Sequence, residues 1–263
     1  MSTEIHPTAI VDGRARIADG VRIGPYCIVG PEVSLGPGCV LQSHVVITGR
    51  TTVGAGNRFF PFASIGQEPQ DLKYHGEPSV VEIGENNTFR EYVTVNAGTE
   101  GGGMVTSIGS NCLLMAYAHV AHDCRIGNRV IMANCATLAG HVEVQDGAII
   151  GGLAAVHQFL KIGRMAMVGG TAGVNKSVPP FCLVSGGYRP HLVGLNIVGL
   201  KRAGIANEEI RALKRVYRIL LKESGRLETR LRLAEEAGGD SELAREMIAF
   251  VREAKGGLTL HGG

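Results

Sequence analysis

The sequence is poor in aromatic residues and contains no tryptophan, and the aromatic share is only 5% of 263 residues. A surface that binds single-stranded nucleic acid by stacking bases on aromatic rings is therefore not expected. The net charge is also small, at +2 with histidine neutral, and gives no sign of a strongly anionic partner. Both observations argue against a nucleic-acid partner.

Long apolar runs are missing as well. The longest uncharged apolar stretch, residues 147–156, falls short of the ~18 residues that span a bilayer, so no membrane span is expected. The first residues have neither the basic start nor the apolar run of a secretory signal, which favours a cytoplasmic protein. Six cysteines occur without a CxxC pair, and we interpret them as small core residues rather than as disulfides or metal ligands.

Glycine, by contrast, is plentiful, and a six-residue period accompanies it. The chain has 38 glycines but only 10 prolines, and its 44% of hydrophobic residues argues against disorder. Apolar residues recur at every sixth position from Ile5 to Ile65, from Ile83 to Val95 and from Ile108 to Val174. All 26 positions are apolar, and at 44% hydrophobic content the probability of this by chance is on the order of 10⁻⁹. The period predicts a parallel β-helix in which three hexads form one triangular coil.

Each position of the hexad has an expected place in the coil. The apolar anchor fills the interior, a small residue four positions later fits where the triangle narrows, and glycine after the anchor gives the corner backbone freedom. Residues one coil apart stack at a spacing of about 4.8 Å. The period itself does not reveal the hand of the helix.

Two interruptions and a helical tail depart from the period. Segments 67–82 and 99–107 do not fit it and are predicted to protrude as loops, which are common places for function. After Pro179-Pro180 the pattern becomes helical, so we expect a β-helix domain over residues 1–185 and an α-helical domain over residues 186–263. Asn207 and Ser241 are predicted to cap two of its helices.

The two predicted domains differ in charge. Residues 1–185 hold 12 basic and 14 acidic residues, a net charge of −2, whereas residues 186–263 hold 14 and 10, a net charge of +4. The basic helical part suits an acidic partner, although ordinary solvated helices have similar charges.

Histidines gather in one window of the repeat, at positions 119, 122, 141 and 157. The coil length places His122, Gly140 and Gln158 in one column, so the four imidazoles are expected on one side of the solenoid within ~10 Å. A neutral imidazole can accept a hydroxyl proton near pH 7, which makes acid–base catalysis one interpretation. A three-histidine metal site like those of zinc hydratases, or simply a wet surface, are the alternatives.

Two neighbours of His122 favour catalysis. Gly140 has no side chain and leaves its backbone N–H accessible as an oxyanion donor. Asp123 is a candidate to orient His122, although adjacent residues on a strand normally face opposite ways.

The motifs AHVAHDC, GGLAAVHQF, QDLKYHGEP and GLNIVGLKRAG resemble the acyl-carrier-protein to UDP-N-acetylglucosamine O-acyltransferases that begin lipid A synthesis. The resemblance extends over essentially the whole chain. It implies a left-handed β-helix and a homotrimer with active sites between subunits. It also implies transfer of a 3-hydroxyacyl chain from the phosphopantetheine of acyl carrier protein to the 3-position of UDP-N-acetylglucosamine, with no metal or bound cofactor.

The resemblance also implies roles for individual residues. His122 matches the general base, Asp123 the residue that supports it, and Gly140 the oxyanion donor. The positions that match substrate contacts are Gln70, Asp71, Lys73, His119, His141, His157, Gln158, Gly170, Asn196 and Arg202. Gly170 matches the position that limits acyl length, and the absence of a side chain there resembles members that accept longer chains.

The sequence departs from the family pattern at a few positions. Asn96-Ala97 stands where many members have His-Arg, Val198 replaces a frequently acidic residue, and Ala203 replaces a second arginine. These departures leave open whether the acceptor carries a 3-hydroxyl or a 3-amino group. Three rival functions stay open as well: the N-acyltransferase of the same pathway, which usually carries an extra N-terminal domain, a metal-dependent hydratase, and a non-catalytic scaffold.

Overall fold

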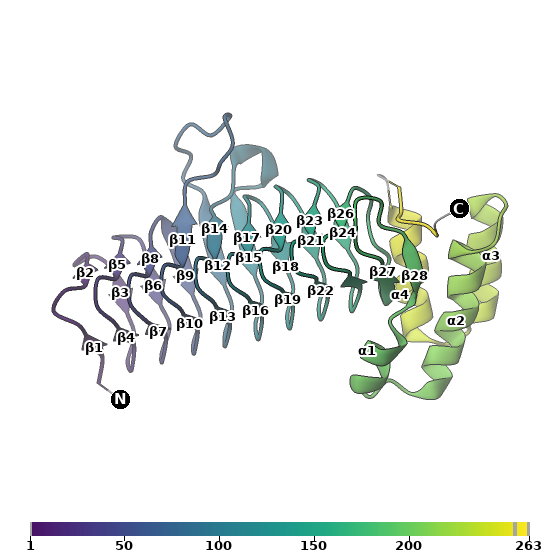
Figure 1. The fold of residues 1–263 in the computed structure, drawn as a ribbon, viewed down its shortest axis with the longest axis horizontal. Coiled ribbons are helices and arrows are strands. Elements are labelled where there is room, and N and C mark those ends of the chain that lie inside the picture. The colour runs from purple at the N-terminus through teal and green to yellow at the C-terminus, as the bar shows by residue number, and fades with distance from the viewer. Residues whose placement is uncertain (1, 255–256, 262–263) are drawn as a thin grey trace.

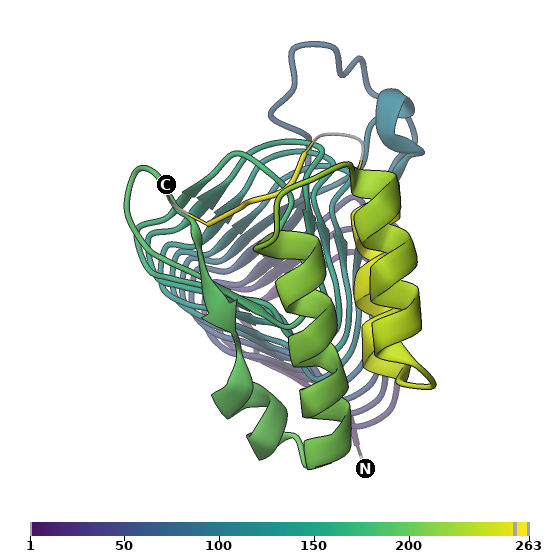
Figure 2. The same ribbon diagram turned by 90° about the vertical axis from the view of Figure 1, so that its right-hand side faces the viewer.

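The computed structural model describes residues 2–254 and 257–261, which form a triangular parallel β-helix closed at one end by helices (Figures 1 and 2). The first of its three sheets has 11 strands: β1 (Glu4–Ile5), β4 (Arg22–Ile23), β7 (Val40–Leu41), β10 (Arg58–Phe59), β13 (Thr88–Phe89), β16 (Leu113–Leu114), β19 (Ile131–Met132), β22 (Ile149–Ile150), β25 (Met167–Val168), β27 (Cys182–Val184) and β28 (Leu192–Leu195). The second has nine: β2 (Ile10–Val11), β5 (Ile28–Val29), β8 (Val46–Ile47), β11 (Ser64–Gln67), β14 (Thr94–Asn96), β17 (His119–Val120), β20 (Thr137–Leu138), β23 (Ala155–Val156) and β26 (Gly173–Val174). The third has eight: β3 (Arg16–Ile17), β6 (Ser34–Leu35), β9 (Arg50–Val53), β12 (Val80–Ile83), β15 (Val105–Ile108), β18 (Arg125–Ile126), β21 (Glu143–Val144) and β24 (Lys161–Ile162).

Strand pairing confirms the predicted coil. Ile5 pairs with Ile23, and Val120 pairs with Leu138, so the parallel partners lie one three-hexad coil apart. The single antiparallel pair among the described strands joins β27 to β28 and ends the first sheet beneath the helices.

The predicted anchors line the interior. From Ile23 to Val174 every anchor is buried, whereas Ile5 is 48% exposed because no coil covers the N-terminal end. Phe59 and Phe89 show how the interior accommodates rings: they stack one coil apart, with centroids 4.8 Å apart and an interplanar angle of 9°.

All six cysteines are unpaired, and five of them are buried, as expected for small core residues.

The expected role of glycine at the corners is only partly right. The left-handed backbone conformation at the corners belongs mostly to other residue types, such as Tyr26 (φ 58°) and His141 (φ 61°). Glycine after an anchor instead permits close packing between coils, because a Cβ on Gly24 would lie 2.5 Å from the carbonyl oxygen of Gln42. Interior glycines of this kind are therefore needed for space rather than for backbone freedom.

The two predicted loops exist but are shorter than expected. They cover residues 68–79 and 97–104, because Val80–Glu82 and Val105–Ser107 pair with each other in β12 and β15. A short 3₁₀ helix, η1 (Glu100–Gly102), lies in the second loop. Figure 1 shows both loops rising from the same edge of the solenoid, in consecutive coils.

Within the described part of the chain, four helices form the cap: α1 (Ile197–Arg202), α2 (Asn207–Leu221), α3 (Leu227–Gly238) and α4 (Glu242–Glu253). Ser241 caps α4 as predicted, since its Oγ accepts the Ala244 N–H at 3.2 Å. The prediction for Asn207 is wrong: Ala206 is the N-cap of α2, and Asn207 is the first helical residue. Among the described helices, none combines the length and apolarity needed to cross a bilayer.

Candidate active site

The histidines meet at the corner between the second and third sheets, on the side that carries the two loops. The His141 N–H donates to the His122 carbonyl at 3.0 Å, and the two imidazoles meet edge to face with centroids 5.0 Å apart. The coil spacing thus brings these two rings together as the repeat predicts.

His122 and Asp123 form a hydrogen-bonded pair at this corner. They lie in a turn after β17 rather than on a strand, and Asp123 has the left-handed conformation with φ 60°. Its Oδ2 lies 2.8 Å from His122 Nδ1. Neighbours on a strand would face opposite ways, but these two residues lie in a turn, so the Asp123 carboxylate points back toward the His122 ring.

The Asp123 carboxylate is held from several sides, and its side chain is fully buried. Thr99 of the second loop donates its N–H to Oδ1 at 2.9 Å and its hydroxyl to Oδ2 at 2.6 Å. The Asp123 N–H donates to Thr106 Oγ1 at 2.8 Å. An ionised carboxylate only accepts hydrogen bonds, so the neutral His122 tautomer that fits this contact has its proton on Nδ1 and its lone pair on Nε2.

Thr99 and Thr106 are site residues that the sequence analysis missed. The only signal for Thr106 is its place two residues before the anchor Ile108, and because it lies in the segment predicted as a loop, its fully buried position in β15 is not expected from the sequence. Thr99 had no such signal, because it lies in a loop outside the period.

Gly140 packs against the free edge of the His122 ring. A Cβ built on it would lie 2.4 Å from His122 Cε1 and 2.6 Å from Nε2. Among the described residues its N–H has no acceptor. What distinguishes Gly140 is that its backbone, which no side chain covers, lies beside His122 Nε2, the ring nitrogen that does not contact Asp123.

His119 and His141 lie near this pair, whereas His157 and Gln158 lie one coil farther along the solenoid than His141. His119 Nδ1 lies 2.7 Å from the Thr94 hydroxyl, and burial, with a smaller effect of His122, lowers its pKa below the usual 6.5. His141 stacks on Phe159 at 4.4 Å, and burial is also the main cause that lowers its pKa. His157 and Gln158 are exposed on the next coil, and the ring of His157 lies 3.2 Å from the Gln158 carbonyl.

The first loop brings charges toward the histidines. Asp71 Oδ1 accepts the Lys73 N–H at 3.0 Å, and this hydrogen bond is the main cause that lowers the pKa of Asp71. Lys73, His122 and His141 lower it further through their charges, so the loop lies within electrostatic reach of the corner. Gln70 and Lys73 are exposed in this loop.

Three predicted contact residues are not part of this cluster. Gly170 is exposed at another corner, between the first and second sheets. Asn196 caps α1 by accepting the Gly199 N–H at 3.0 Å and donates to the Met165 carbonyl at 3.0 Å. Arg202 is exposed at the end of α1, which Figures 1 and 2 place on the side of the molecule away from the loops.

The positions that depart from the family pattern have different surroundings. Asn96 is buried and donates to the Glu68 carbonyl at 2.8 Å, which fastens the start of the first loop. Ala97 is buried beside it, whereas Val198 and Ala203 are exposed on the cap.

His122, Asp123 and His141 also form the set of donors that comes closest to a metal site. Their nearest ligand atoms lie within 4.8 Å of one another. Asp123 Oδ2 already lies within hydrogen-bond distance of His122 Nδ1 and Thr99 Oγ1, so a cation there would have to displace both. The donor set therefore fits a histidine–carboxylate pair better than a metal site.

Comparison with known proteins places the chain among acyltransferases. A family model described as UDP N-acetylglucosamine O-acyltransferase, domain 2, matches residues 178–259, and the bacterial transferase hexapeptide model matches residues 14–49 and 106–140. The structure of LpxA from Acinetobacter baumannii is 40% identical, with 97% of this chain and 99% of that chain covered and a TM-score of 0.94. The UDP-N-acetylglucosamine acyltransferase of Campylobacter jejuni is 38% identical, with 98% and 100% covered and a TM-score of 0.93. Another solved UDP-N-acetylglucosamine acyltransferase is 40% identical, with 99% and 100% covered and a TM-score of 0.94.

A triangular coil of hexapeptide repeats with a histidine–aspartate pair at one corner defines an acyltransferase of the hexapeptide-repeat class. The particular family follows from the near-complete coverage at 40% identity: the chain belongs to the UDP-N-acetylglucosamine O-acyltransferases. The left-handed β-helix expected from the resemblance is thereby confirmed.

Proposed function

We propose that the protein transfers a 3-hydroxyacyl chain from the phosphopantetheine of acyl carrier protein to the 3-hydroxyl of UDP-N-acetylglucosamine, the first step of lipid A synthesis. The observation that carries this proposal is the His122–Asp123 pair, with the open backbone of Gly140 beside its Nε2 edge. Family membership supports the sugar nucleotide as acceptor.

In the proposed reaction, His122 Nε2 accepts the proton of the 3-hydroxyl while the hydroxyl oxygen attacks the thioester carbonyl carbon. Asp123, through Nδ1, fixes the tautomer and stabilises the imidazolium that forms. The Gly140 N–H donates to the oxygen of the tetrahedral intermediate. Cleavage of the carbon–sulfur bond then releases the pantetheine thiol, to which the imidazolium returns the proton.

Substrate contacts are proposed for the residues around this centre. Lys73, exposed in the first loop, suits a phosphate of the nucleotide or donor. The remaining contacts proposed at this corner are Gln70, Asp71, His119, His141, His157 and Gln158. We propose that Gly170, which projects no side chain into the solvent, leaves room for a long acyl chain.

A homotrimer would complete the site. Helix α1, which begins after Asn196 and ends at Arg202, lies on the side of the molecule away from the loops and their histidine corner (Figures 1 and 2), so these two residues are proposed to contact the substrate of a neighbouring subunit. The second sheet also exposes apolar side chains, with Ile10 67% and Ile28 40% exposed, as a surface between subunits would.

Mixing two inactive variants tests the shared site. His122→Ala and Arg202→Ala chains, co-expressed with different tags and purified as mixed trimers, should regain activity, because about a third of the interfaces in a mixed cyclic trimer pair both wild-type residues. The same variants mixed after purification without subunit exchange are the control. Activity that stays at the level of the inactive parents would argue that both residues serve one chain.

Acyl carrier protein, acidic as a class, is proposed to dock on the basic face of α2. Lys214, Arg215 and Arg218 lie on this helix, and Lys214 and Arg218 border a groove with Tyr217 and Lys222. Reversing the charge of the first three residues should raise the KM for acyl carrier protein at low salt and leave that for UDP-N-acetylglucosamine unchanged. An unchanged KM for the carrier would count against this dock.

The reaction itself is tested with purified protein and acyl carrier proteins loaded with chains of different length. UDP-N-acetylglucosamine and its 3-amino analogue are offered in parallel, and products are identified by mass. His122→Ala should abolish most transfer. Activity that depends on near-stoichiometric zinc and is lost on chelation would favour a metal-dependent hydratase instead.

A further inference from the structure

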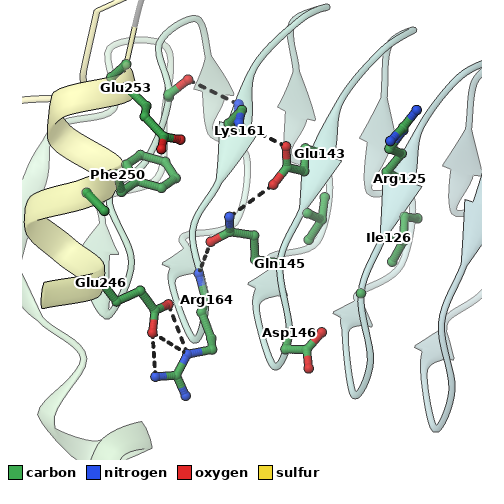
Figure 3. A pocket seen from close by; sticks show the side chains of 15 residues that line it. Arg125, Ile126, Glu143, Gln145, Asp146, Lys161, Arg164, Glu246, Phe250 and Glu253 are labelled. Atoms are coloured by element: carbon green, nitrogen blue, oxygen red, sulfur yellow. Dashed lines mark hydrogen bonds and ion pairs between the residues drawn. The ribbon is translucent and has the colours of Figure 1, made fainter. Parts of the chain in front are cut away.

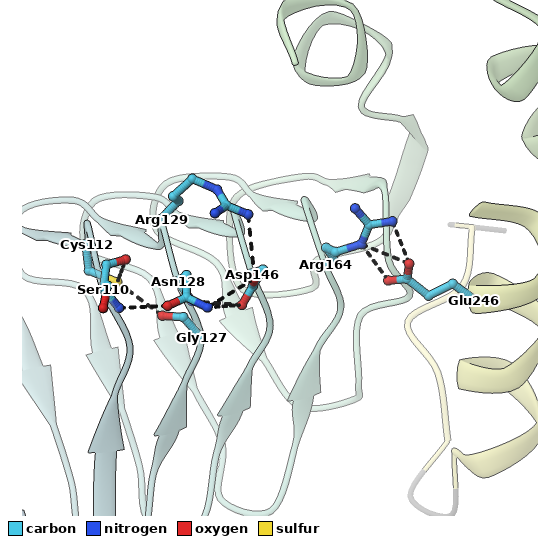
Figure 4. Close-up of polar contacts among 8 residues, drawn as sticks. All are labelled: Ser110, Cys112, Gly127, Asn128, Arg129, Asp146, Arg164 and Glu246. Atoms are coloured by element: carbon cyan, nitrogen blue, oxygen red, sulfur yellow. Dashed lines mark hydrogen bonds and ion pairs between the residues drawn. The ribbon is translucent and has the colours of Figure 1, made fainter. Parts of the chain in front are cut away.

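A polar column runs along the corner between the third and first sheets and ends at Arg164 (Figure 4). In this column the Ser110 N–H donates to Asn128 Oδ1 at 2.9 Å, and the Asn128 N–H donates to Asp146 Oδ1 at 2.8 Å. Each residue thus fastens one coil to the next. Arg164 occupies the same hexad position in the last coil, where its side chain turns to the cap instead.

Arg164 forms a forked ion pair with Glu246 of α4. Its Nε lies 2.9 Å from both carboxylate oxygens, and Nη2 lies 2.6 Å from Oε2 (Figures 3 and 4). Both side chains are 33% exposed, so water screens this pair less than the cap's surface pairs. Two parallel hydrogen bonds of this kind fix orientation as well as distance.

The solenoid holds Arg164 from the other side. The guanidinium lies over the ring of the buried Phe181, 4.8 Å from its centroid. The Arg164 N–H donates to Gln145 Oε1 at 3.0 Å, and the Phe181 N–H donates to the Arg164 carbonyl at 2.7 Å. Figure 3 shows this chain of contacts continuing from Gln145 through Glu143 to Lys161.

Helix α1 is fastened at the same corner. Asn196, its N-cap, donates from Nδ2 to the carbonyl of Met165, the residue after Arg164. The Asn196 N–H donates to the Phe181 carbonyl at 2.7 Å. Two separate helices of the cap, α1 and α4, are therefore positioned by one corner of the last coil.

We propose that Arg164 is a positioning residue for nucleotide binding: Glu246 holds its guanidinium over Phe181, and Phe181, whose carbonyl accepts the Asn196 N–H, sets the place of α1 and hence of Arg202. The proposal rests on the proposed function in one respect, the contact of Arg202 with the sugar nucleotide. Arg164 itself lies at a corner other than that of His122, so it acts on substrate placement and not on the chemical step.

The test compares Arg164→Gln, Glu246→Gln and the double variant with wild type. Each single variant should raise the KM for UDP-N-acetylglucosamine roughly tenfold, with kcat and its pH profile unchanged, because the base and its carboxylate stay in place. The double variant should be no worse than Arg164→Gln, because both substitutions break the same link. Arg211→Gln is the matched control, since its solvent-exposed pair with Glu208 joins two residues within α2.

Binding of UDP-N-acetylglucosamine, measured by calorimetry without any turnover, separates failure of this proposal from failure of the proposed function. Arg202→Ala reports whether the nucleotide contact exists. The charge-exchanged variant Arg164→Glu with Glu246→Arg should recover part of the lost affinity, which keeps the test valid if a single variant folds poorly. The positioning role would be overturned if Arg202→Ala weakened binding while Arg164→Gln kept wild-type affinity. Additive losses of affinity in the double variant would also overturn it.

Discussion

Replacing Gly140 with alanine should inactivate the enzyme while leaving its fold intact. The new Cβ would lie 2.4 Å from His122 Cε1 and 2.6 Å from Nε2. Carbon atoms pack no closer than about 3.5 Å, so the ring must move by about 1 Å. Its hydrogen bond to Asp123, now 2.8 Å long, cannot survive such a shift without movement of the buried carboxylate.

The magnitude follows from this displacement. A 1 Å misplacement of a reacting group can reduce the rate by about 10²-fold, equivalent to roughly 2.7 kcal/mol of the activation barrier. Gly140 has no positive φ, so alanine can adopt its backbone conformation, and the backbone N–H is kept. We therefore expect kcat to fall about 10²-fold with little change in the melting temperature.

Gly13→Ala is the matched control for this experiment. Gly13 follows its anchor Val11 as Gly140 follows Leu138, at the same corner of the solenoid, and a Cβ there meets nothing within 4 Å. Steady-state kinetics with UDP-N-acetylglucosamine and acyl carrier protein, together with thermal melting, compare the two variants. A Gly140→Ala enzyme with wild-type kcat would refute the reasoning.

Three further predictions concern stability. Thr99→Val removes a hydroxyl that donates to Asp123 and should lower the free energy of unfolding in denaturant titrations by roughly 1.5–3 kcal/mol, so an unchanged value would deny this hydrogen bond a role. Phe89→Ala breaks the buried stack with Phe59 and should cost about 3–5 kcal/mol in the same assay, and a loss below about 1 kcal/mol would mean that the coil collapses around the cavity. Because burial lowers the pKa of His119 below 6.5, the unfolded chain binds more protons just below that pH, and the free energy of unfolding falls as the pH decreases through this window. His119→Gln should make that part of the pH dependence shallower, and identical slopes for variant and wild type would contradict the assignment.

The strands and half of the site could be predicted from the period, because both depend on residues one coil apart. His122 and Gly140 lie one coil apart, so the period predicts that they are neighbours. The turn that directs Asp123 to His122 could not be predicted, since the same left-handed conformation is adopted by residues as different as Phe62, Arg129 and Asp123. Residue type does not indicate the backbone conformation at these corner positions, because the coil imposes the φ angle.

The loop boundaries could not be predicted for a different reason. Val80–Glu82 and Val105–Ser107 contain no anchor of the period, yet they extend β12 and β15 by pairing with each other. This pairing depends on the course of two neighbouring insertions, which the sequence of either one does not contain. The role of Thr99 could not be predicted for the same reason, because its contact with Asp123 depends on the path of the second loop.

The pairing across the insertions has a consequence for how such an enzyme can change. Val53 pairs with Ile83, 30 residues later, and Ile83 with Ile108, 25 residues later, yet β12 keeps its register with both neighbouring strands of the third sheet. In the second sheet, the register of β11 and β14 shifts only between Ile65 and Gln67, next to the first insertion. Chain length at this corner is thus independent of the repeat. Evolution or protein engineering can lengthen, shorten or exchange the first of these segments while the remaining coils keep their geometry, whereas any change to the second must retain Thr99, which holds the Asp123 carboxylate.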